Sequence, residues 1–188
     1  MIDLFHLAAD LQDFFIQEQW KFCFIGGIAL QRWGEPRLTR DLDIILLTGY
    51  GAEESFVDKL LAHYQGRRVD VKEFALTRRV LLLRSKSGIG IDIALAGLPF
   101  EETVIRRATR FEFIPEATLL TCSAEDLIIM KAFADRGRDW LDVETVIIRQ
   151  QGNLDWRYVF EQLTPLCEIK ESPEIITKLK NLRQDHYY

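Results

Sequence analysis

Apolar residues recur along this chain with two different periods, which predict a mixture of helices and strands. Near the start, Leu4, Leu7, Leu11 and Phe14 return at helical spacing and predict a helix over residues 3–19. Short, continuous apolar runs predict strands instead. These runs span residues 21–25, 41–47, 80–83 and 89–95, with shorter extended pieces at 111–114 and 118–121. The helical pattern returns between them over residues 28–33 and 53–64.

From residue 123 onward the pattern is helical only. Ser123 and Asp126 form a capping-box pattern, with Asp in place of the commoner Glu, and Pro173 stands at a favoured first helical position. The predicted helices span residues 123–134, 139–149, 155–166 and 173–183. We therefore expect an α/β (α+β) fold, in which a mixed β-sheet flanked by helices is followed by a C-terminal helical segment. Residues 1–120 are expected to form the first domain, and residues 121–188 a helical region packed on it.

Composition narrows the class of protein but does not identify it. The 188 residues are 48% hydrophobic and 28% charged, which is ordinary globular usage. A net charge of -5 argues against a general polyanion binder, because such binding depends on many Lys and Arg contacts to phosphate. The three cysteines are scattered, which is typical of reduced thiols, and no apolar run is long enough to cross a membrane. With no basic region ahead of an apolar run at Met1, we expect a soluble, cytoplasmic protein.

Two glycines follow the first predicted strand and precede a helix. Gly26 and Gly27 let a ligand approach the backbone closely, and the N–H groups at the start of a helix favour an anion such as phosphate. A tight turn is the ordinary alternative explanation for such a pair.

Three aspartates stand on predicted strands. Residues i and i+2 of a strand face the same side, so Asp41 and Asp43 converge while Leu42 faces a core. A pair of carboxylates spaced in this way can hold Mg²⁺, or it can belong to a solvated face. Asp92 alternates with isoleucines and has Gly90 and Ala94 as its nearest neighbours on the same face. Such an acid is solvated on an edge strand, paired, or bound to metal.

These residues carry a family resemblance. They resemble the nucleotidyltransferase superfamily with the DNA polymerase β-like palm, and most closely the AbiEii/AbiGii-toxin-like nucleotidyltransferases. The resemblance rests on Gly26-Gly27, Arg37-x-Thr39-x-Asp41-x-Asp43, Asp92, Lys131 and the run Arg136-Gly-Arg-Asp139-Trp-Leu-Asp142. It implies that residues 1–120 are a catalytic domain.

The resemblance also implies a two-metal site for Mg²⁺ or Mn²⁺. Asp41, Asp43 and Asp92 are the implied catalytic residues and metal ligands, with Asp92 beside the cation that activates an acceptor hydroxyl. Two such cations about 4 Å apart stabilise the attacking and leaving oxygens of an in-line displacement.

The nucleotide would be bound by neighbouring residues. The implied nucleotide-binding set is Gly26, Gly27, Arg37, Thr39 and Lys131. The glycines would cradle the β- and γ-phosphates, Thr39 would donate a hydroxyl hydrogen bond, and Lys131 would contact the triphosphate. Arg37 is either a phosphate contact or a structural partner of one of the acids.

The implied reaction is metal-dependent transfer of a nucleoside monophosphate from an NTP to an acceptor hydroxyl, with release of pyrophosphate. The acceptor is an RNA such as tRNA, a protein or a small molecule, and a cognate antitoxin or toxin is an expected partner. Two alternatives stay open: a catalytically silent interaction protein of a toxin–antitoxin pair, and a small-molecule or antibiotic nucleotidyltransferase.

Two further charged groups have structural explanations. Seven Lys or Arg residues lie between Arg67 and Lys86, either as a solvated face or as a guide for a polyanionic acceptor such as RNA. Arg136, Arg138, Asp139 and Asp142 fit a salt-bridge set around the turn at Gly137 better than a direct catalytic role.

Overall fold

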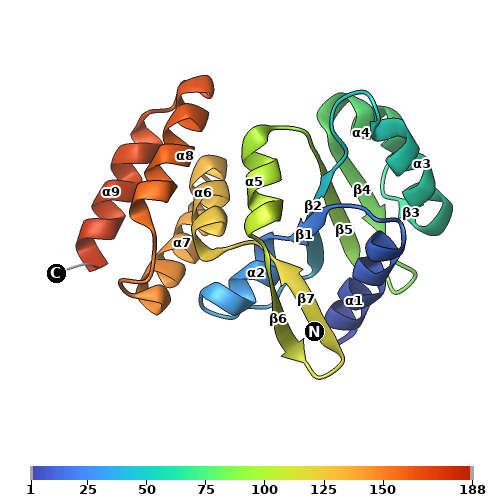
Figure 1. The fold of residues 1–188 in the computed structure, drawn as a ribbon, viewed down its shortest axis with the longest axis horizontal. Helices are drawn as coiled ribbons and strands as arrows, with labels where there is room; N and C mark the ends of the chain where they lie inside the picture. The colour runs from blue at the N-terminus through green and yellow to red at the C-terminus, as the bar shows by residue number, and fades with distance from the viewer. Residues whose placement is uncertain (1, 187–188) are drawn as a thin grey trace. The chain divides into compact units, whose positions relative to one another are not determined.

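The computed structural model describes residues 2–186, which contain a seven-stranded sheet and flanking helices (Figure 1). The elements are α1 (Ile2–Gln17), β1 (Phe22–Phe24), α2 (Gly26–Trp33), β2 (Asp41–Leu47), α3 (Glu53–His63), β3 (Gln65–Gly66), α4 (Val71–Arg78), β4 (Val80–Arg84), β5 (Gly90–Ala96), α5 (Pro99–Arg107), β6 (Thr109–Ile114), β7 (Ala117–Thr121), α6 (Ala124–Ala134), α7 (Gly137–Gln150), α8 (Trp156–Ile169) and α9 (Glu174–His186). None of the helices within residues 2–186 is both long and apolar enough to span a membrane.

The strands lie in the order β3-β4-β5-β2-β1-β7-β6. β2 pairs in parallel with β5, and β1 pairs in parallel with β7, whereas the other neighbours are antiparallel. The predicted mixed sheet flanked by helices is therefore confirmed. β5 lies between β4 and β2, so the alternative that Asp92 stands on an edge strand is wrong.

One face of the sheet carries the hydrophobic core. Leu42, Ile44 and Leu46 alternate along β2, are fully buried, and belong to one cluster with Ile91 and Ile93 of β5. Apolar side chains of α1, α3 and α4 cover this face. Burying each such aliphatic side chain contributes about 1.5–3 kcal/mol. This burial determines which side chains of each strand face the core.

The opposite face is covered only in part. α5 packs against β1 and β2 there and buries Val104. Near the start of β2 the same face carries Asp41, which is exposed, and Asp43, which is half-buried. The polar end of this face is where the candidate site lies.

The chain forms two compact units: one comprises Met1–Ile28 and Leu38–Cys122, the other Ala29–Arg37 and Ser123–Tyr188. The second unit contains α6 to α9, drawn in orange to red (Figure 1), and the C-terminal part of α2. Its helices begin close to the predicted positions. The Ser123 cap is confirmed, because its hydroxyl accepts a hydrogen bond from the Asp126 N–H at 3.1 Å.

Three short elements are absent from the sequence prediction: β3, α4 and α5. β3 has two residues, α4 buries Val71 and Ala75, and α5 buries Val104, which is too few apolar positions to produce a periodic pattern. α5 does carry a start signal. Pro99 opens the helix, and the Glu101 carboxylate accepts hydrogen bonds from two backbone N–H groups just before it, at 2.8 and 2.9 Å.

Candidate functional site

The parallel pairing of β2 with β5 brings the three predicted acids together. Asp43 is the direct cross-strand partner of Asp92, and Asp41 is the partner of Gly90. Because alternate residues of a strand face the same side, Asp41, Asp43 and Asp92 share the face opposite the core. About a third of the Asp92 side chain is exposed to solvent (35%), so a ligand can reach its carboxylate.

The two glycines of the turn lie directly against these polar side chains. Gly26 has a φ of +54°, and a Cβ atom there would stand 2.1 Å from Asp43 Oδ2. The Gly27 N–H donates a 3.4 Å hydrogen bond to the same oxygen, and a Cβ on Gly27 would stand 2.4 Å from Thr39 Oγ1. The predicted residues Gly26, Gly27, Thr39 and Asp43 are therefore gathered at the N-terminus of α2.

A residue that the motifs do not include, Arg67, also belongs to this face. Its backbone N–H donates to Leu82 O at 2.9 Å, and Leu82 is the cross-strand partner of Asp92. From there the Arg67 guanidinium forms an ion pair with the Asp92 carboxylate. A Cβ on Gly90 would meet both Asp41 Oδ1, at 2.1 Å, and Arg67 Nη1, at 3.1 Å. The guanidinium thus stands beside two of the three predicted metal ligands.

The donor set suits a hard divalent cation. Mg²⁺ and Mn²⁺ prefer carboxylate oxygens, which Asp41, Asp43 and Asp92 supply from adjacent strands. As the side chains stand, no three acidic, histidine or cysteine groups within residues 2–186 converge closely enough to hold a metal. Asp92 is engaged by Arg67 instead. The three carboxylates are therefore of the ligand type that a divalent cation prefers, but in this structure they do not converge on one point and Asp92 is paired with Arg67.

The remaining predicted nucleotide contacts, Arg37 and Lys131, belong to an ion-pair cluster inside the second unit. Arg37 donates two hydrogen bonds to Asp142, from Nε at 2.9 Å and from Nη2 at 2.8 Å. Lys131 Nζ donates to Asp142 at 2.6 Å and to Asp139 at 3.0 Å. Arg136 also lies near Asp139, at 3.7 Å. Asp139 and Asp142 thus form salt bridges, with Arg37 and Lys131 as their main partners.

Asp142 is almost completely buried, at 4% exposure. Burial alone would raise the pKa of its carboxyl group, but hydrogen bonds from Arg37 and Lys131 hold that pKa below its ordinary value of 3.8. The carboxylate therefore stays ionised in the folded protein.

The basic stretch from Arg67 to Lys86 is not a continuous free cationic surface. Besides Arg67, Arg68 pairs with Asp70 at 2.9 Å, Lys72 pairs with two acids of α3, and Arg79 pairs with Glu53. Four of its seven cations are thus occupied by acids, which favours the structural explanation over an RNA guide.

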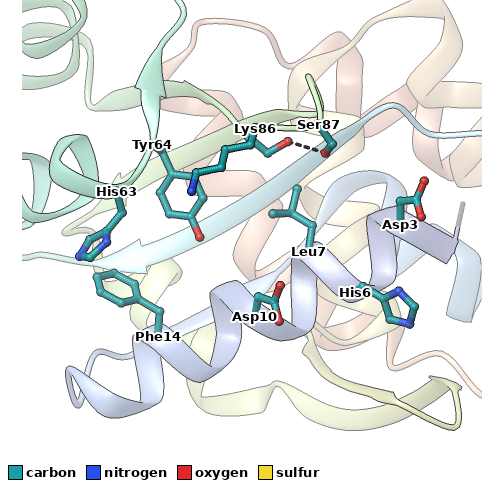
Figure 2. A pocket seen from close by; sticks show the side chains of 10 residues that line it. Asp3, His6, Leu7, Asp10, Phe14, His63, Tyr64, Lys86 and Ser87 are labelled. Atoms are coloured by element: carbon teal, nitrogen blue, oxygen red, sulfur yellow. Dashed lines mark hydrogen bonds between the residues drawn. The ribbon is translucent and has the colours of Figure 1, made fainter.

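A cavity of about 600 Å³ lies between α1, the end of α3 and the β4–β5 turn (Figure 2). Its lining residues are Asp3, His6, Leu7, Asp10, Phe14, His63, Tyr64, Ser85, Lys86 and Ser87. Burial, together with the nearby Asp10 carboxylate, raises the pKa of Tyr64. Because α1 covers the core face, this cavity is distinct from the face that carries Asp41, Asp43 and Asp92.

Two solved structures share the fold of this chain. One is an antigenic nucleotidyltransferase-like protein from Paracoccidioides brasiliensis, with 17% identity and a TM-score of 0.53, covering 94% of this chain and 92% of that chain. The other is the lincosamide antibiotic adenylyltransferase LnuA with lincomycin bound, with 14% identity and a TM-score of 0.50, covering 72% of this chain and 91% of that chain. The fold is therefore of the nucleotidyltransferase type.

The family follows from the sequence itself. A family model described as "Nucleotidyl transferase AbiEii toxin, Type IV TA system" matches residues 7–163. The chain belongs to this AbiEii family, and the resemblance identified from the motifs is confirmed. A comparison with curated proteins gives no match.

We predict that Gly26→Ala destabilises the first unit more than Gly49→Ala does. Both glycines have a positive φ, +54° and +70°, so both substitutions impose the same kind of backbone strain. Only at Gly26 does the new Cβ meet another group, the side chain of Asp43, whereas Gly49 has nothing within 4 Å. Forcing Asp43 to move should cost at least about 1 kcal/mol more in unfolding free energy, measured by urea denaturation. Equal losses at the two positions would contradict the close contact with Asp43.

We also predict that Asp142→Asn lowers the unfolding free energy by about 3 kcal/mol at pH 7, because it leaves buried cations without their carboxylate. The matched control Glu161→Gln removes an exposed ion pair with Arg157 and should cost less than about 1 kcal/mol.

The loss at Asp142 should depend on pH. Since folding lowers the pKa of Asp142, its contribution is complete above its ordinary value of 3.8 and is lost as the pH falls below that value. Urea unfolding followed by tryptophan fluorescence should therefore show a smaller difference between Asp142→Asn and wild type at pH 3 than at pH 7. A difference of constant size would rule out this carboxylate as the ionised centre of the cluster.

Proposed function

We propose that this protein transfers a nucleoside monophosphate from a nucleoside triphosphate to an acceptor hydroxyl and releases pyrophosphate, with Mg²⁺ or Mn²⁺ held by Asp41, Asp43 and Asp92. One observation carries the proposal. Asp43 and Asp92 pair in register beside the Gly26 turn, in a chain that belongs to a nucleotidyl transferase family. Carboxylates for cations and a helix N-terminus for phosphate then lie on the same face of the sheet.

The three aspartates would have different roles, because they stand on different strands. Asp41 and Asp43, on β2, would hold the cations that accompany the triphosphate, and Asp92, on β5, would face the acceptor hydroxyl. Bound cations offset the charge of the phosphates and acidify the hydroxyl. The backbone N–H groups of Gly26 and Gly27 would take the β- and γ-phosphates, because neither residue has a side chain of its own and the Gly27 N–H would exchange its Asp43 partner for a phosphate oxygen.

Three side chains are further proposed nucleotide contacts, Thr39 in the first unit and Lys131 and Arg37 in the second. Thr39 packs against Gly27 and would donate its hydroxyl to a phosphate oxygen. Lys131 would contact the triphosphate through its ammonium group, which has three N–H donors, of which Asp139 and Asp142 take two. Arg37 has two alternative roles. It is either the structural partner of Asp142, through its two hydrogen bonds, or a contact to a phosphate of the nucleotide.

In the proposed step the acceptor oxygen attacks the α-phosphorus. A new P–O bond forms, and the bond from the α-phosphorus to the oxygen that bridges it to the β-phosphate breaks. The electron pair of that bond leaves with pyrophosphate, and the acceptor proton passes to the carboxylate of Asp92. Because Asp92 is a third exposed, the acceptor can approach it from solvent.

The family description names a type IV toxin–antitoxin system, so we propose a cognate antitoxin as the functional partner. An RNA such as tRNA, a protein and a small molecule all carry hydroxyl groups that this chemistry can modify, and a labelling experiment distinguishes them.

One observation favours a second candidate function. Asp92 is already paired with Arg67, which is compatible with an interaction protein that keeps the fold without catalysis. The two candidates differ in their response to ligands. An active enzyme is stabilised against heat by Mg²⁺ together with its NTP, because ligands that bind only the folded state raise the unfolding midpoint. A catalytically silent protein shows no such metal-dependent shift.

We predict that Asp43→Asn reduces nucleotidyl transfer at least about a hundredfold, because stabilising the charge of a transferring phosphoryl group is worth several kcal/mol. The protein is incubated with each of four α-labelled NTPs, Mg²⁺ or Mn²⁺, and pools of tRNA, protein or small hydroxylated acceptors. The acceptor pool that carries the label identifies the acceptor, and the labelled NTP that reacts identifies the base.

The matched control is Asp58→Asn, which removes an exposed carboxylate from α3 in the same unit and should leave transfer unchanged. Chelation of the metal should abolish labelling. Undiminished transfer by a folded Asp43→Asn protein would exclude this face as the active site.

A further inference from the structure

Arg67 has no role in the proposed reaction, although it lies on the face that carries the acids and forms an ion pair with Asp92. We propose that Arg67 is the resident counter-cation of Asp92, which a divalent cation must displace, so that Arg67 stabilises the metal-free site and weakens metal binding. This inference rests on the proposed function, since it concerns the same three carboxylates.

The sheet holds Arg67 in line with these acids. Its backbone is hydrogen-bonded to Leu82 of β4, Leu82 pairs with Asp92 of β5, and Asp92 pairs with Asp43 of β2. Strand pairing therefore places the start of the Arg67 side chain two strand spacings from Asp92, with β4 between them. The side chain is 23% exposed and reaches Asp92 on the face opposite the core. No rearrangement of the sheet is needed either to make this contact or to break it.

The guanidinium occupies the position that a cation would take. It pairs with Asp92 Oδ1, and its Nη1 lies against Gly90, where Asp41 Oδ1 also lies. A carboxylate oxygen that accepts from a guanidinium offers that lone pair to no metal ion. A divalent cation held beside Arg67 would also be repelled by its charge. The ion pair and metal binding at Asp92 are therefore in competition.

The way Arg67 is held differs from the way Arg37 is held. Arg37 grips Asp142 with two parallel hydrogen bonds around a carboxylate that is 6% exposed. Arg67 makes its contact through Nη2, while its Nε is buried with no hydrogen-bond partner among the described residues. A buried donor without an acceptor carries a desolvation cost, which release of the side chain to water removes. The Arg67 pair is thus the more readily exchanged of the two.

The decisive test compares Mn²⁺ binding to wild type, Arg67→Gln and Arg68→Gln by titration calorimetry and by electron paramagnetic resonance. Arg68→Gln is a matched control, because it removes the same charge from the neighbouring residue, whose partner is the exposed Asp70. We expect Arg67→Gln to bind Mn²⁺ at least about tenfold more tightly than wild type, and Arg68→Gln to bind as wild type does.

A purely structural role for Arg67 gives a different pattern. If Arg67 is a counter-cation, Arg67→Gln lowers the thermal midpoint of the metal-free protein and yet raises its metal affinity, whereas damage to the fold would lower both. Unchanged or weaker Mn²⁺ binding by Arg67→Gln, with Asp43-dependent binding by wild type, overturns the role of Arg67 and leaves the proposed function standing. Absence of Mn²⁺ binding in both proteins overturns the metal site and the inference together.

A second measurement uses the wild-type chain and needs no variant to fold. Phenylglyoxal modifies accessible arginine side chains, and peptide mass spectrometry locates the adducts. Addition of Mg²⁺ should increase modification of Arg67 severalfold relative to Arg68, which serves as the internal reference. Modification of Arg67 that does not respond to Mg²⁺ in a protein that binds the ion overturns the proposal.

Discussion

The parallel pairing of β2 with β5 is the constraint on which the arrangement of the site depends. Its register places Asp43 opposite Asp92 and Asp41 opposite Gly90, with Ile44 opposite Ile93 on the other face. A shift of the β2 register by one residue would turn Asp41 and Asp43 toward the core and the aliphatic side chains of β2 toward solvent. The desolvation of two unpaired carboxylates opposes that shift, and the burial of the aliphatic residues favours the native register. The core and the polar face are therefore specified by one and the same alignment.

The polar face depends on glycines, whose lack of a side chain leaves room for the polar groups beside them. Each of three glycines faces a polar group that would collide with a Cβ atom: Gly26 faces Asp43, Gly27 faces Thr39, and Gly90 faces Asp41. The acids can therefore lie close to the backbone, where the N–H of Gly27 reaches a carboxylate oxygen. Only Gly26 among the three also requires a positive φ, so sterics and backbone conformation both act at that position.

Periodicity in the sequence was sufficient for the longer strands and for the shared orientation of Asp41 and Asp43, because the side-chain period of two is a local property. That Asp92 shares their face follows from the pairing of β2 with β5. Periodicity was insufficient for Arg67, which looked like one more charge in a basic stretch. Its role depends on β3 pairing with β4 and β4 with β5, and β3 is only two residues long. The sequence predicted salt bridges of Asp139 and Asp142 with Arg136 and Arg138, whereas the structure pairs Asp142 with Arg37 and Lys131. The Arg37 contact could not be assigned, since sequence spacing carries no information about a contact across 105 positions.

That long separation has a consequence for how the protein is made. Residues 29–37 leave the ribosome early, yet they belong to the same unit as the helices after residue 122. Arg37 must wait until Asp142 has been synthesised, and Glu35 must wait for Thr145, to which its N–H donates at 3.1 Å. During translation at about 5–20 residues per second, the strands of the first unit can pair before Asp142 and Thr145 are available to this segment. The nascent chain therefore carries Arg37 for several seconds before Asp142 can pair with it, a period in which a chaperone or a partner protein could bind the segment.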